Sequence, residues 1–160
     1  MEVTVMDSVD VSAAIELLEA RMVILGGVRQ KNPGESHPDM PMRHLFAPGL
    51  YAREIFMPAG MVVTTKIHLT EHFFIVSKGA ARVFHEGEGW VRIEAPYFGR
   101  TECGTRRVLL IEEDMIWTTF HATDMTDVAE IEMEIFETPP NELIPLAEHA
   151  MACLVEGGLA

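Results

Sequence analysis

The chain has 160 residues, 48% of them hydrophobic and 23% charged, a composition typical of a single soluble globular domain. Its 25 Asp and Glu residues outnumber its 12 Lys and Arg residues, and a formal net charge of −13 argues against direct binding to nucleic acid or to an anionic membrane surface. No apolar run is long enough to span a bilayer, and the first residues lack the features of a secretory signal. We therefore expect a protein that is not secreted through a signal peptide and is either cytoplasmic in the producing cell or associated with a larger particle.

Residues 1–27 predict an N-terminal helix, because apolar residues recur there at spacings of three and four before a pair of glycines. The pattern consists of Ile15, Leu18, Met22 and Leu25, followed by Gly26 and Gly27. Residues 28–49 contain four prolines and little periodicity. They predict an extended arm, which either wraps around its own domain or reaches a neighbouring subunit.

Residues 50–123 consist of short β-branched and aromatic runs, about ten residues apart and separated by turn residues. The runs are 50–57, 61–69, 72–77, 81–85, 90–96, 105–111 and 115–121, and the predicted turns include 58–60, 78–79, 86–89 and 112–114. This texture predicts seven or eight antiparallel strands in a sandwich or barrel.

Residues 124–160 predict a helical tail. The run 126–136 fits both a helix and a strand, and Thr126 as a helix cap favours a short helix. Prolines end this element, and the run 145–157 then predicts a terminal helix.

Two histidines, His68 and His72, lie four residues apart within the strand-like segment 60–79. On a strand, His68 shares a face with the polar Thr64 and Lys66. A tight turn at 69–71 would bring His72 onto the neighbouring strand, beside His68. Two imidazoles in that position can contact one metal ion.

The spacing of this segment resembles the first motif of the cupin superfamily, which runs Gly, five residues, His-x-His, three or four residues, Glu, six residues, Gly. In this chain Gly60, His68 and Gly79 keep the family residues. Lys66 stands in the first histidine position, and His72 stands in the glutamate position.

The second cupin motif, Pro-x-Gly-x-x-His, is matched in part. Gly104 supplies the glycine, whereas Glu102 replaces the proline and Arg107 replaces the histidine. The resemblance implies an all-β fold, a single cupin-like double-stranded β-helix (jelly roll) with an N-terminal helix and a C-terminal helical tail. Residues 1–160 would form one domain with its barrel at 50–123.

Of the family's ligand positions, only His68 keeps its family residue. His121, at the end of the run 115–121, could compensate and join His68 and His72 in a three-histidine site for a divalent transition metal such as Zn, Fe, Mn or Ni. Arg107 and Lys66 would receive a small anionic ligand.

A plainer interpretation stays open, in which the histidines are hydrogen-bonded hairpin residues of a barrel without metal. Cations in the barrel would oppose a metal ion, and they would instead favour an anion or pair with carboxylates. The candidate partners are Glu71, Glu102 and Glu113.

Residues 44–137 also resemble small cupin-like proteins encoded by tailed bacteriophages. This resemblance implies a virion or infection role, and the alternative function is therefore a virion structural protein, a capsid-decorating or cement-type jelly roll. The expected partners are a second copy of the chain in a dimer or trimer and a capsid or virion protein. With most family ligands replaced, no catalytic activity can be assigned, and any enzyme activity would be metal-dependent chemistry of the cupin type.

Overall fold

The computed structural model describes residues 20, 28–29, 34, 37–85, 89–136 and 143–144. They form one antiparallel sheet and one short helix, so the expected all-β fold class is confirmed. The elements are β1 (Val28–Arg29), β2 (Met42–Ala47), β3 (Leu50–Met57), β4 (Val62–Thr64), β5 (His72–His85), β6 (Gly89–Glu94), β7 (Tyr97–Thr101), β8 (Val108–Ala122), α2 (Val128–Ile135) and β9 (Leu143–Ile144). No helix within these ranges is long and apolar enough to cross a membrane.

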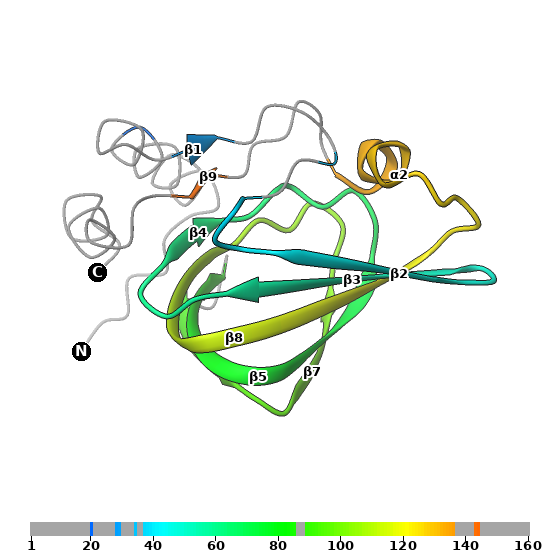
Figure 1. Cartoon of the computed structure of the whole chain (residues 1–160). Coiled ribbons are helices and arrows are strands. Elements are labelled where there is room, and N and C mark those ends of the chain that lie inside the picture. The colour runs from blue at the N-terminus through cyan, green and yellow to red at the C-terminus, as the bar shows by residue number, and fades with distance from the viewer. Residues whose placement is uncertain are drawn as a thin grey trace.

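Two long strands, β5 and β8, pair with each other and organise the sheet. The C-terminal half of β8 pairs with β3 and the N-terminal half of β5 pairs with β7, so one half-sheet runs β2-β3-β8-β5-β7. The other halves of the same two strands pair with β4 and β6, which gives a second half-sheet, β4-β8-β5-β6. Figure 1 shows β5 and β8 curving so that the two half-sheets face each other as a jelly roll.

Both long strands contain a predicted turn that the structure does not form. Residues 78–79 lie inside β5, and residues 112–114 lie inside β8. The register of the pair shifts between Val76 and Ala81, where Gly79 has a φ of 83°, and a Cβ on Gly79 would overlap the carbonyl oxygen of Asp114. Glycine and exposed acidic residues mark a bulge as well as a turn, so the sequence signal here indicates the bend of a continuous strand.

The last part of the segment predicted as an extended arm, 28–49, is a strand of the barrel sheet. Residues 42–47 form β2, an edge strand that pairs with β3 through a turn in which Gly49 has a φ of 72°. Residues 28–29 form β1, which pairs with β9. The predicted helices at 1–27 and 145–157 lie outside the described residues.

The helix predicted after residue 126 is confirmed, and it is α2. Its N-cap is Asp127 rather than Thr126, because the Asp127 side chain accepts a hydrogen bond from the Glu130 N–H at 3.0 Å. The helix is anchored on the segment after β4, since the Leu69 N–H donates to the Ile135 carbonyl at 2.8 Å.

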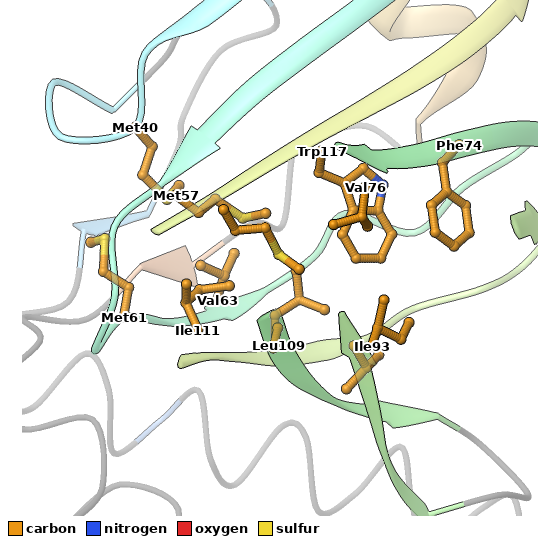
Figure 2. Close-up of a cluster of buried hydrophobic side chains, with 13 residues drawn as sticks. Met40, Met57, Met61, Val63, Phe74, Val76, Ile93, Leu109, Ile111 and Trp117 are labelled. Atoms are coloured by element: carbon orange, nitrogen blue, oxygen red, sulfur yellow. The ribbon is translucent and has the colours of Figure 1, made fainter. Parts of the chain in front are cut away.

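The hydrophobic core has two parts. The larger cluster fills the space between the half-sheets, and it includes the buried Val63, Leu109 and Trp117 (Figure 2). A smaller cluster joins α2 to β3 and consists of Tyr51, Ile131, Ile135 and Phe136. A pocket that combines apolar and charged side chains lies between these two clusters, because residues of both line it.

Candidate functional site

The structure brings the three predicted histidines together. The ring centroids of His68 and His72 are 5.1 Å apart, and those of His72 and His121 are 4.4 Å apart. All three side chains are buried. The turn at 69–71 therefore does what the sequence predicts, and β8 delivers His121 through its pairing with β3 and β5.

These imidazoles are neutral at pH 7. Burial lowers the pKa of His68 to about 3 and that of His121 to about 3, and it also lowers the pKa of His72. Nδ1 of His68 is 3.0 Å from the Thr105 carbonyl, and Nδ1 of His72 is 3.0 Å from the Thr70 carbonyl. A carbonyl only accepts, so both Nδ1 atoms carry the proton and both Nε2 atoms keep a lone pair.

Two of the histidine nitrogens lack partners. Nε2 of His72 and Nδ1 of His121 are buried without a hydrogen bond within the described part of the chain. The other His121 nitrogen, Nε2, lies 2.9 Å from the Thr119 hydroxyl. Buried polar atoms are rarely left unsatisfied. His72 lines the pocket, so a water or a ligand there can reach its Nε2, whereas His121 is not among the described residues that line it.

Three cationic side chains share the pocket with His68 and His72. Arg53, Lys66 and Arg107 are 7%, 2% and 6% exposed, and all three line the pocket. Across the residues that the structure describes, no Asp or Glu lines it.

One buried carboxylate lies behind two of these cations. Glu132 of α2 places Oε1 3.3 Å from Arg53 Nη2 and Oε2 3.4 Å from Lys66 Nζ. Its Oε2 also accepts a hydrogen bond from the Gly34 N–H at 2.6 Å. The Arg53 contact is an ion pair without hydrogen-bond alignment, and Nε and Nη2 of Arg53 are buried without a hydrogen bond to any described residue.

Arg107 has no carboxylate partner among the described residues. One Nη donates to the Thr101 hydroxyl at 3.1 Å, and the guanidinium lies 5.5 Å from the centre of the Phe74 ring and 6.0 Å from that of Trp117. Burial lowers the pKa of Arg107 to about 10, so the group is still charged at pH 7. The backbone N–H of Arg107 donates to the Thr65 hydroxyl. Both threonine hydroxyls accept from Arg107, which leaves their own protons to donate.

The pocket is small. Its free volume for water-sized molecules is about 60 Å³. One water needs ~10–15 Å³ on this scale, so the pocket has room for a few waters or for a compact group such as a carboxylate.

The histidines do not fit a metal ion in this arrangement. A bound zinc would need three lone-pair nitrogens converging at ~2.0–2.1 Å from one point. No three His, Cys, Asp or Glu side chains among the described residues are placed to hold a metal ion together. The charge of Arg53, Lys66 and Arg107 around the histidines also opposes a divalent cation.

The sequence predicts two of the three pocket cations, Lys66 and Arg107, but not their partners. Lys66 pairs with Glu132, whereas the proposed partners Glu71 and Glu102 pair with Arg100. Of the remaining proposed partners, Glu113 lies 3.8 Å from Arg92.

Two residues of the site were not predicted from the sequence: Arg53, which lines the pocket, and Glu132, which pairs with two of the pocket cations. Arg53 occupies an alternate position of β3 between the buried Tyr51 and Met57, so an arginine on an apolar strand face was the available signal. Glu132 follows the buried Ile131 on the core-facing stripe of α2. A charge on such a stripe indicates a buried ion pair.

Comparison with solved structures supports the fold. Ectoine synthase from P. lautus matches with a TM-score of 0.55 over 74% of this chain and 84% of that chain, at 15% sequence identity. This chain has a cupin-type fold. KdgF from Halomonas sp. (18% identity, 57% and 88% of the chains, TM-score 0.47) and a cupin-2 domain protein from Shewanella frigidimarina (12%, 56% and 84%, TM-score 0.44) are weaker likenesses and add nothing to the assignment. No protein-family model and no curated protein matches the sequence. At these identities the likeness establishes the fold alone.

Proposed function

We propose that this cupin-type barrel binds a small anionic ligand in the pocket between its two half-sheets. The observation that carries the proposal is the lining of the pocket, which holds three buried cations and, within the described residues, no carboxylate. Glu132 pairs with Arg53 and Lys66, whereas Arg107 is buried without a carboxylate among the described residues. A buried charge is costly unless it is paired, so an anion gains more at Arg107 than it would at a solvated cation.

Arg107 is the principal ligand-binding residue in this proposal. It is charged, buried and without a carboxylate among the described residues, and its planar guanidinium can hold a carboxylate or phosphate oxygen pair. The Thr101 and Thr65 hydroxyls, each of which accepts a hydrogen bond from Arg107, also line the pocket and can donate. Lys66 and Arg53 also line the pocket and supply further positive charge next to Glu132.

The test is a comparison of small anions at constant ionic strength. Acetate, formate and phosphate would be titrated into the protein, with acetamide as the uncharged match for acetate, and binding would be followed by isothermal titration or thermal shift. We expect saturable anion binding that Arg107→Met abolishes and that Arg43→Met leaves unchanged. Arg43 is an exposed arginine that lines neither the pocket nor its entrance, which makes it the matched control. Equal responses to acetate and acetamide, or equal binding by the two variants, would overturn the proposal.

A second candidate is the divalent metal on His68, His72 and His121. The unpartnered His72 Nε2 and His121 Nδ1 favour it, and the surrounding cations and the absence of a converging donor set in the described residues oppose it. Elemental analysis of protein purified without added metal separates the two functions. Stoichiometric Zn, Fe, Mn or Ni that is lost in a His68→Ala, His72→Ala double variant would support the metal site.

The phage-encoded origin and the virion role remain proposals that rest on the resemblance of residues 44–137 and on the acidic composition. Stable binding to a phage capsid, unchanged by Arg107→Met, would support a capsid-decorating protein. Self-association as a dimer or trimer is likewise a prediction, and the mass of the particle in solution tests it. The binding proposal assigns no reaction.

A further inference from the structure

A second, larger pocket adjoins the first, at the open end between β5, β6 and β7. Its free volume for water-sized molecules is about 310 Å³. Much of its wall is apolar, and the apolar lining consists of Phe74, Val83, Val91, Ile93, Tyr97 and Gly99. Val91 and Tyr97 are 39% and 41% exposed, which places part of this wall at the protein surface. We call this space the outer pocket and the histidine-lined space the inner pocket.

Arg107 lines both pockets, and it is the residue that they share within the described ranges. Its guanidinium lies over the faces of Phe74 and Trp117, whose rings stack at a centroid distance of 4.4 Å. Phe74 lines the outer pocket, and Trp117 lines the inner one. The buried cation therefore stands at the junction of a small space lined by three cations and a larger space whose wall is about half apolar.

The two volumes decide how a ligand can be oriented. An apolar protein cavity of ~150 Å³ accommodates a benzene molecule. The inner pocket, at about 60 Å³, is too small for a ring, whereas the outer pocket, at about 310 Å³, is large enough. A ligand that carries both an anionic head and an apolar body can therefore bind with its head at Arg107 only if the body lies in the outer pocket.

The rim of the outer pocket is polar but balanced. Arg100 and Glu102 both line it, and they form an ion pair with each other at 3.2 Å. Arg100 also pairs with Glu71 at 3.1 Å. Because these rim charges are paired with each other, we expect Arg107 to be the cation that favours a negatively charged ligand. The apolar part of the wall would favour a ligand with an apolar body.

We propose that the ligand is a monocarboxylate with a small aromatic or branched apolar body, its carboxylate held by Arg107 and its body packed against Val83, Val91 and Ile93. This inference rests on the proposed anion binding and narrows the class of anion. It predicts that affinity rises with the apolar body, because the body leaves water for an apolar wall.

The test uses acetate and phenylacetate as probes on the full chain with isotope-labelled Ile and Val methyl groups. Phenylacetate should bind about tenfold or more tightly than acetate. Its ring should shift the methyl resonances of Val83, Val91 and Ile93, whereas the methyls of Val63 in the inner pocket should shift far less. Arg107→Met should remove the binding of both carboxylates, and benzyl alcohol, which has the ring without the charge, should bind at least about tenfold more weakly than phenylacetate.

Each failure has its own meaning. If acetate binds and phenylacetate binds no more tightly, the amphipathic ligand class is overturned and anion binding stands. Ring-induced shifts centred on Val63 would overturn the placement of the body in the outer pocket. If neither carboxylate binds the unmodified protein, the anion-binding function itself falls. Should Arg107→Met fail to fold, Arg107→Lys keeps the test, with weaker binding of both carboxylates expected because a point charge replaces a bidentate fork.

Discussion

Replacing Glu132 by Gln should destabilise the fold strongly, because it removes the carboxylate that two buried cations share. The Glu132 side chain is 2% exposed, with its oxygens 3.3 Å from Arg53 Nη2 and 3.4 Å from Lys66 Nζ. The substitution keeps the shape of the side chain but leaves both positive charges buried. Removing one partner of a buried ion pair costs about 3–5 kcal/mol, and a domain of this size has a total stability of about 5–15 kcal/mol.

Urea unfolding followed by circular dichroism measures this loss. The matched control is Glu134→Gln on the same helix, whose exposed side chain makes a change within about 0.5 kcal/mol the expected result. Adding Lys66→Met to Glu132→Gln should recover part of the loss, with a coupling free energy of about 1 kcal/mol or more. A loss below about 1 kcal/mol for Glu132→Gln, no different from the control, would refute the buried ion-pair account.

Two further predictions concern pH and the strand bend. Because the pKa values of His68 and His121 are about 3 in the folded protein against 6.5 in the unfolded chain, the unfolded state binds more protons below pH 6.5, and stability should fall as pH drops from 6.5 towards 3. Between pH 7 and pH 5, each of these histidines should account for a loss of about 2 kcal/mol in the free energy of unfolding. Replacing His121 by Gln should therefore reduce the loss over this pH range by about that amount. An unchanged pH dependence in His121→Gln would show that folding does not lower the pKa of His121. Gly79→Ala should cost at least about 2 kcal/mol more than Gly104→Ala in urea unfolding, because both glycines have positive φ (83° and 82°) but only at position 79 would the new Cβ overlap the neighbouring backbone. Equal losses of unfolding free energy in the two variants would mean that the positive φ of Gly79, and not the close approach of the neighbouring strand, accounts for the glycine at the bend.

The sequence predicts which segments form the strands of the barrel better than it predicts how those strands are bounded and paired. The alternation of apolar and polar residues and the positions of turn residues predict most of the strands. The residues at 78–79 and 112–114, however, fit a turn between two strands as well as a bend within one strand. The pairing of β5 with β8 decides between a turn and a bend, and this contact between distant parts of the chain cannot be predicted from the local residue pattern. The same limit applies to 42–47, where an edge strand next to a proline and glycine turn looks like an arm until its partner β3 is known.

In the candidate site, too, the sequence predicts the local feature but not the contacts between distant residues. The spacing of His68 and His72 fixes a local turn, so the sequence predicts their proximity. The ion pair of Lys66 with Glu132 joins residues that are 66 positions apart and on different elements, and it depends on how α2 packs against β3. The junction of the two pockets at Arg107 likewise depends on the stacked Phe74 and Trp117 and on the placement of β6.

The central claim is that Arg107 holds an anion inside the barrel, and the Nε–H resonance of Arg107 in ¹H–¹⁵N NMR spectra reports on this directly. Acetate added at constant ionic strength, with chloride as the balancing anion, should shift this resonance in a saturable manner, and the signal should be identified by its absence in Arg107→Met. A resonance that stays in place up to high acetate, or one that moves equally with acetamide, would contradict anion binding at Arg107.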